Sequence, residues 1–184
     1  MTAIVLRVPG SRGIRFAGLL AALTCLVILP LRAAEPETVK IAVFEFELDD
    51  RSASDGVVEA NAADAEYLKA ATETARGLLA DSGRYSIVDA AGATDALASA
   101  GGVRHCSGCE SRLAAELGAD RSMAGIVTRI TRTEYTLQIV VRDARTGMLL
   151  SNDFTGLRMG ANYSWPRGVK SLMTKGILSA AAPR

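Results

Sequence analysis

The spacing of apolar and polar positions along the chain predicts strands and helices in a clear order. Residues 39–48 are dense in β-branched and aromatic side chains, which is typical of a strand. From about residue 61 to residue 81 the apolar positions fall instead on one helical stripe, which Ser82-Gly83 ends. The same reasoning gives strands at 39–48, 85–88, 123–130, 135–142 and 148–156. It gives helices at 61–81, 90–100, 110–117 and from about Ser164 onward.

The order β-α-β-α-α-β-β-β-α predicts the topology. Strands joined through a helix favour parallel pairing with a right-handed crossover, whereas the last three strands form an antiparallel meander. We therefore expect an α/β domain with an α+β tendency, built on a mixed five-stranded sheet with helices packed mainly on one face. The side chains expected on the inward face of the fourth strand are Leu137, Ile139 and Val141. Those expected on the free face of the sheet are Gln138, Arg142 and Arg129.

Residues 1–34 have the three zones of a secretory signal peptide: a basic start, an apolar run and a pair of small residues. The apolar run spans about 16 residues, which is short against the roughly 20 that a membrane span needs. We expect cleavage after Ala33 or Ala34, leaving residues 35–184 as a single periplasmic or secreted domain. The alternative is an uncleaved membrane anchor, in which case this segment alone contacts the membrane.

Cleavage changes the charge of the chain. The full sequence has 21 basic and 20 acidic residues. Four of the basic residues leave with the signal peptide, so 17 remain against the 20 acidic residues, a net charge of −3. Nucleic-acid-binding domains need a basic surface. We therefore expect no nucleic-acid partner.

Six short strings give the chain a resemblance to a known group of proteins. They are residues 40–49, 82–85, 106–110, 117–120, 143–147 and 160–165. In this order they resemble an uncharacterised family of exported bacterial proteins. The strand-helix-strand pattern is also similar, more loosely, to the α/β domains of the TolB amino-terminal and CsgG type. Those domains bind envelope proteins, so the resemblance implies an envelope or periplasmic protein as partner, although a fold does not fix a function.

The Cys106-x-x-Cys109 pair is the sharpest chemical feature of the sequence. It lies at the start of the helix expected at 110–117, where backbone N–H groups lower a cysteine pKa. In an oxidising compartment two cysteines favour a structural disulfide. Redox exchange is an alternative. Another is a soft-metal site made of Cys106, Cys109 and His105, but one histidine and two cysteines are one ligand short of a structural zinc site.

Two further groups of side chains are candidates for binding. Trp165 and Tyr163 are aromatic residues near a helix start, as in many interfaces. Arg129 and Arg142 lie near one hairpin and offer charge to an acidic partner. The alternatives are that Trp165 packs on the sheet edge and that the arginines lie on a solvated strand face.

Acidic residues gather at the end of the first strand, where ligands of α/β sheets often bind. Glu45 and Glu47 are expected on one face of the strand, as a paired-carboxylate or cation site. Asp49 and Asp50 extend the patch. The alternative is a solvated strand face and loop.

The sequence contains neither a phosphate-binding Gly-rich loop nor a Gly-x-Ser-x-Gly elbow, and it has one histidine. We therefore expect a non-catalytic periplasmic module that binds an envelope protein and needs no cofactor. The alternatives are thiol redox or soft-metal handling at Cys106-x-x-Cys109, and binding of a small molecule.

Overall fold

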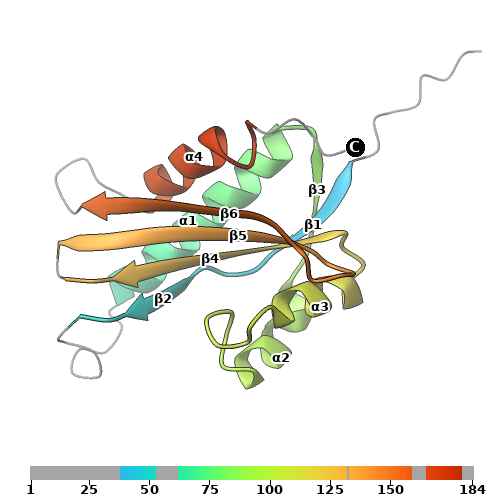
Figure 1. The fold of residues 1–184 in the computed structure, drawn as a ribbon, viewed down its shortest axis with the longest axis horizontal. Coiled ribbons are helices and arrows are strands. Elements are labelled where there is room, and N and C mark those ends of the chain that lie inside the picture. Colours follow the sequence, from blue (N-terminus) through green and yellow to red (C-terminus); the bar gives the residue numbers. More distant parts are fainter. Residues whose placement is uncertain (1–37, 53–61, 132, 159–164, 180–184) are drawn as a thin grey trace, which may run out of the picture. The chain divides into compact units, whose positions relative to one another are not determined.

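The computed structural model describes residues 38–52, 62–131, 133–158 and 165–179. They form a mixed sheet in the order β3-β1-β4-β5-β6, in which β2 also pairs with β4 (Figure 1). The strands are β1 (Val39–Val43), β2 (Glu47–Asp50), β3 (Tyr85–Val88), β4 (Arg121–Arg129), β5 (Glu134–Asp143) and β6 (Leu149–Arg158). The helices are α1 (Ala62–Asp81), η1 (Ala91–Ala93), α2 (Thr94–Ser99), α3 (Cys109–Glu116) and α4 (Trp165–Lys175). The predicted fold class is confirmed.

The strands pair as predicted, in parallel where a helix joins them and antiparallel in the final meander. β1 is parallel to β3 and β4, and β4, β5 and β6 are antiparallel. The inward face of β5 is as predicted, since Leu137, Ile139 and Val141 belong to the main hydrophobic core. No helix in the described ranges is both long and apolar enough to cross a membrane. The signal peptide expected at residues 1–34 lies outside the described residues.

The strand expected at residues 39–48 is interrupted, and this gives the sheet six strands instead of five. β1 and β2 both run parallel to β4, with residues 44–46 between them. Phe44 packs into the smaller core, on the same face as Ala42, whereas Phe46 packs into the main core on the opposite face. The alternation of side chains between the two faces therefore shifts by one residue at the interruption. As a result Phe44 is buried on one face of the sheet and Phe46 on the other.

Helix α1 satisfies backbone groups that the interruption leaves outside the ladder. The Phe46 N–H donates to Thr72 Oγ1 at 3.0 Å, and Arg76 Nη2 donates to the carbonyl oxygen of Val43 at 2.9 Å. Buried backbone groups need such partners. The interruption is therefore a stable part of the fold.

Helices cover the two faces unequally. α1 and α4 lie over one face, where their apolar side chains complete the main core with β1, β4 and β5. The short helices α2 and α3 lie on the other face and complete a smaller core there with Ala42, Phe44 and Ala124. The described helices therefore leave the second face open over most of β5 and β6.

Candidate functional site

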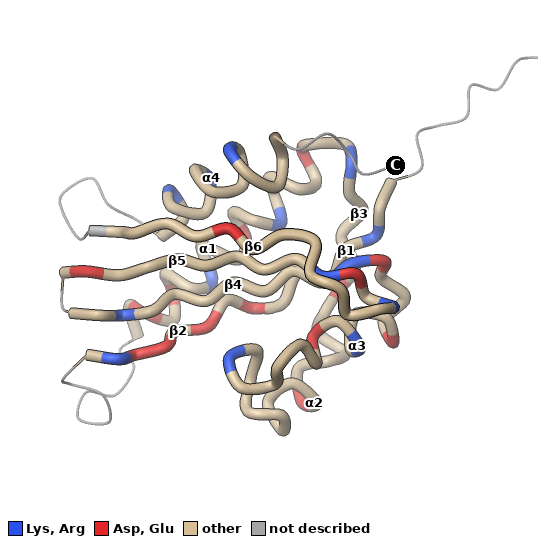
Figure 2. Tube along the Cα trace, viewed as in Figure 1, with Lys and Arg blue, Asp and Glu red and all other residues tan. Residues whose placement is uncertain are grey.

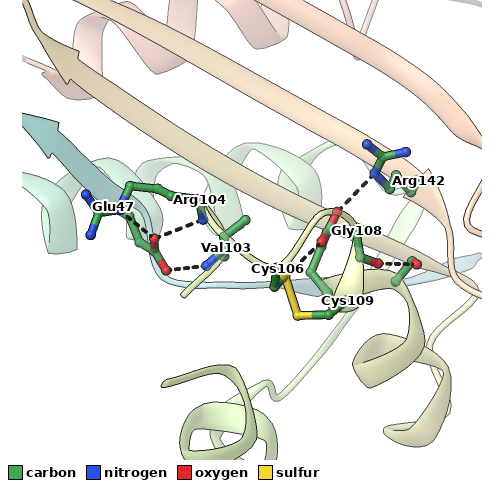
Figure 3. Close-up of a disulfide and its surroundings, with 9 residues drawn as sticks. Glu47, Val103, Arg104, Cys106, Gly108, Cys109 and Arg142 are labelled. Atoms are coloured by element: carbon green, nitrogen blue, oxygen red, sulfur yellow. Dashed lines mark hydrogen bonds and ion pairs between the residues drawn. A yellow bond between two sulfur atoms is a disulfide. The ribbon is translucent and has the colours of Figure 1, made fainter. Parts of the chain in front are cut away.

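The two cysteines lie at disulfide-bonding distance where the loop meets α3, with their Cα atoms 5.2 Å apart (Figure 3). Cys109 is the first residue of α3 and its N–H donates to the Cys106 carbonyl at 3.1 Å. Ser107 and Gly108, which separate the cysteines, both have positive φ, at 51° and 98°. This tight turn brings the sulfurs together, as the C-x-x-C spacing predicts.

A carboxylate from β2 holds the loop that leads to Cys106. Glu47 accepts hydrogen bonds from the N–H groups of Val103 at 2.7 Å and Arg104 at 3.2 Å, and from Arg104 Nε at 3.1 Å (Figure 3). The preceding Gly102 has a φ of 81°, and a Cβ there would lie 2.5 Å from Glu47 Oε1. Glycine at this position therefore lets the loop close on the carboxylate.

This arrangement corrects the expected paired-carboxylate site on the first strand. Each acidic side chain is bound by an arginine: Glu45 by Arg76, Glu47 by Arg104, Asp49 by Arg51 and Asp50 by Arg129. Ion pairs with arginines therefore replace a shared cation site, and Arg104 reaches both Glu47 and Asp49. The pairs made by Glu47 and Asp50 join β2 to the loop before Cys106 and to β4.

Glu110 is a buried carboxylate beside the disulfide, and the sequence analysis missed it. It is 3% exposed. Its Oε1 accepts from Arg142 Nε at 3.1 Å, and its Oε2 lies 3.6 Å from Cys106 Sγ. Among the described residues, Cys106, Cys109 and Glu110 form the group whose potential metal-ligand atoms all lie within 4.8 Å of one another. The available signal was its position, directly after Cys109 and four residues after Cys106.

His105 does not belong to that group, which corrects its expected place as the third ligand. It is exposed and its Cβ lies over Gly101, where an added Cβ would be 3.2 Å away. Adjacent side chains on an irregular loop tend to diverge, which agrees with the absence of the histidine from the group of ligand atoms within 4.8 Å of one another. Arg142, expected to contact a partner, is half-buried and binds Glu110 and the Gly147 carbonyl instead.

Arg129 lies on the helix-covered face, not on the free face where it was expected. It is 9% exposed, and its guanidinium reaches Asp50 at 2.6 Å, Asp64 at 2.5 Å and Tyr135 Oη at 3.2 Å. The register pairs Arg129 with Tyr135, which places it on the same face as the main core. It is therefore a buried ionic anchor between β2, β4 and α1.

The surroundings of Arg129 lower the pKa of the neighbouring Asp50 carboxyl. Burial alone would raise the pKa of the Asp50 carboxyl. Hydrogen bonds from Ser52 and the interaction with Arg129 outweigh burial and hold the pKa below its ordinary value of 3.8. Asp50 therefore stays ionised against the guanidinium well into the acidic range.

Trp165 is 3% exposed and belongs to the main core. Its ring packs against those of Tyr67 and Tyr135, with centroids 5.6 Å and 5.8 Å away. Trp165 is therefore buried between α1, α4 and the inner strand β5 rather than on the sheet edge. Tyr163 lies outside the described residues. Neither the tryptophan nor Arg129 offers an accessible surface in the described part of the chain.

A small cavity lies at the carboxyl ends of the parallel strands β1 and β3, where α/β sheets often bind ligands. Its volume is about 310 Å³, and Phe44, Glu45, Arg76, Asp89 and Thr94 are among the lining residues. Arg76 already contacts Glu45, Glu73 and the Val43 carbonyl. Arg76, the cationic side chain of the described lining, is therefore already engaged and does not await an anionic ligand.

Most of the exposed large apolar side chains lie instead on the open sheet face and the β5–β6 hairpin. Phe154 is 63% exposed and Met148 61% exposed, and Leu149 and Leu150 are also exposed. The exposed Ile130 and Tyr67 lie elsewhere, after β4 and on α1. Phe154 lies opposite Gln138 in the register, on the face away from α1 and α4. The alternation within β6 could have identified Phe154, because it shares the outward phase with Asn152 and Gly156.

A family model described as "Protein of unknown function (DUF2380)" matches residues 39–177, most of the chain. The chain belongs to the DUF3280 family. The expectation of an uncharacterised family is thereby confirmed. No curated protein matches this DUF3280 chain.

Several solved structures are similar to this DUF3280 protein at low identity. Lipoprotein GNA1162 from Neisseria meningitidis is 16% identical, with a TM-score of 0.47, over 77% of this chain and 94% of that one. The LpoB C-terminal domain from Escherichia coli is 20% identical, with a TM-score of 0.43, over 69% of this chain and 87% of that one. The PelC dodecamer from Paraburkholderia phytofirmans is 15% identical, with a TM-score of 0.45, over 78% of this chain and 89% of that one. A likeness at this level carries no argument about function, and the similarity to TolB and CsgG domains is not shown.

Proposed function

We propose that this protein is a non-catalytic module of the bacterial cell envelope that binds another envelope protein through the open sheet face and the outer edge of β6. The observation that carries the proposal is the exposure of Phe154 in the middle of an edge strand. Soluble proteins seldom leave a large aromatic side chain and an apolar hairpin in water without a use for them.

The surface around Phe154 suits a protein partner. Gln138 and Asn152 join their side chains across the strands at 2.7 Å, and Ile126, Thr128, Thr136 and Val140 are partly exposed on the same face. Figure 2 shows that most of β4, β5 and β6 is free of charged positions. An apolar centre with uncharged polar neighbours is the usual composition of an interface core.

The edge of β6 offers a second element of recognition. β6 is the last strand in the sheet order and runs for ten residues, Leu149–Arg158, with one irregularity near Arg142 in its pairing with β5. A long edge strand presents backbone N–H and C=O groups to a partner strand. An extended segment of an envelope protein would add to this edge and place its side chains against Phe154.

The proposed location in the envelope rests on the signal peptide expected from residues 1–34. The expected disulfide chemistry at Cys106 and Cys109 also suits an oxidising compartment. Together these features support a periplasmic position for the domain.

The experiment is site-specific photo-crosslinking in living cells. A photoreactive phenylalanine analogue replaces Phe154, and the matched control replaces Lys170, an exposed residue of α4 on the helix-covered side. We expect one defined envelope-protein adduct from position 154 only, and Phe154→Asp should abolish copurification of that protein. Adducts of equal pattern at both positions, or adducts only between copies of this chain, would contradict the proposal.

A further inference from the structure

We propose that the reduced form of Cys106 and Cys109, together with the Glu110 carboxylate, binds one zinc ion at the start of α3. The inference is independent of the envelope-binding proposal, because the three residues lie at the start of α3 and in the loop before it, not on the edge of β6. It replaces His105 by Glu110 in the ligand set.

The first observation is that Glu110 Oε2 faces sulfur without receiving a hydrogen bond from it. The carboxylate is buried, and among the described residues Oε2 has one neighbour within bonding reach, Cys106 Sγ at 3.6 Å. A disulfide sulfur carries no proton, so it cannot donate to the oxygen. A buried carboxylate oxygen normally has a donor or a cation as partner. A cation bound between Oε2 and the two sulfurs would supply it.

The second observation is the spacing of the ligand atoms. Zinc binds thiolate sulfur at about 2.3 Å and carboxylate oxygen at about 2.0–2.2 Å in a tetrahedron, which separates the sulfur and the oxygen by roughly 3.6 Å. The distance between Cys106 Sγ and Glu110 Oε2 is already 3.6 Å. The sulfurs would move apart to roughly 3.8 Å by rotation about their Cα–Cβ bonds. The Cα separation of 5.2 Å leaves room for this rotation.

The third observation is charge balance. Two thiolates and one carboxylate carry three negative charges, and the zinc ion and Arg142 carry three positive charges. Arg142 Nε binds the other oxygen of Glu110 at 3.1 Å, which orients Oε2 toward the sulfurs. Partners of this kind fix ligand geometry in metal sites. A neutral group of charges is the arrangement that a half-buried position tolerates best.

The donor set selects the metal. Magnesium and calcium require oxygen ligands throughout, and Cu(I) is satisfied by the two thiolates alone. Two thiolates with one carboxylate suit zinc, and three protein ligands leave the fourth position open. The Glu47 contacts to Val103 and Arg104 hold the loop in place before any ion binds.

Access to the site requires a dithiol reductant. Thiol–disulfide exchange transfers two electrons and two protons to the Cys106–Cys109 bond, and the dithiol becomes a disulfide. Binding of Zn²⁺ then releases the two thiol protons. The disulfide and the zinc complex are therefore mutually exclusive states of the same residues.

The test uses the full chain, reduced with a phosphine, freed of it without oxygen, and titrated with Co²⁺ and then Zn²⁺ against a chromophoric chelator. We expect one ion per chain, sulfur-to-cobalt charge-transfer bands, tetrahedral d–d bands, and no binding to the oxidised protein. Glu110→Gln should weaken zinc binding at least 10-fold. Glu116→Gln, at an exposed position on the same helix, and His105→Ala should leave it unchanged.

Three results would overturn the proposal: equal affinities for Glu110→Gln and Glu116→Gln, a loss of affinity in His105→Ala, or cobalt spectra without thiolate bands. Glu110→Asp is the second variant in case the glutamine variant does not fold. It keeps the charge but shortens the reach, so it should also weaken zinc binding while the circular dichroism spectrum stays unchanged. A well-folded Glu110→Asp variant with full affinity would equally contradict the ligand set.

Discussion

Arg142 on β5 and Glu110 on α3 form an ion pair at 3.1 Å across 32 positions of sequence. The glutamate is buried, whereas the arginine keeps part of its side chain in solvent. The pair therefore joins the helix that begins with Cys109 to the sheet, and it fixes the carboxylate whose other oxygen faces the cysteines.

Replacing Arg142 by Met should lower the free energy of unfolding by about 1–3 kcal/mol, because the buried carboxylate loses its charged partner. Urea unfolding followed by circular dichroism measures the change. The double variant with Glu110→Gln should cost less than the two single changes added together. Additive costs, or an equal loss in the exposed control Arg145→Met, would show that the pair has no special role.

Acid should destabilise the protein partly through Asp50. Its pKa is lowered in the folded state, so the folded chain holds the proton less tightly than the unfolded chain. The stabilisation is complete above about pH 4 and is lost as the pH falls through the folded-state value. In Asp50→Asn the melting temperature should therefore fall less between pH 5 and pH 2 than in the parent. Glu66→Gln, on the exposed side of α1, should follow the parent curve.

Glycine-to-alanine changes at two positions should have opposite effects on the free energy of unfolding. Gly102→Ala combines a positive φ with a clash on the Glu47 carboxylate and should cost about 1–3 kcal/mol. Gly77→Ala lies in α1 with open space around the added Cβ and should stabilise by about 0.5–1 kcal/mol. Thermal unfolding of both variants compares them directly. Destabilisation by Gly77→Ala would contradict the helix assignment at that position.

Trp165 is the one tryptophan of the chain, so its fluorescence reports on the main core. Trp165→Ala should cost about 3–5 kcal/mol, whereas Trp165→Phe should cost less because it keeps much of the contact with Tyr67 and Tyr135. In the parent, acrylamide should quench the emission weakly until urea unfolds the chain. Strong quenching of the folded protein would place the ring at the surface.

The sequence predicted the sheet class, the order of the main elements and the inward face of β5, because these follow from apolar periodicity. It did not predict the interruption at residues 44–46, since the apolar run continues through it and only long-range partners such as Thr72 reveal it. Arg129 was placed on the wrong face because its two acidic partners, Asp50 and Asp64, lie far away in sequence. Glu110 was missed because a single glutamate shows neither its burial nor its distance from Cys106.

The disulfide turn contains few residues, and this limits what the bond can do for the fold. Cross-linking two residues three positions apart removes only a small loop-closure entropy from the unfolded chain, on the order of 2 kcal/mol, less than a bridge across a long loop. The main hydrophobic core does not include the two cysteines, which pack against the smaller core. Reduction of the cysteines should therefore cost the main core little, and its structural effect should be confined to the start of α3, away from the edge of β6.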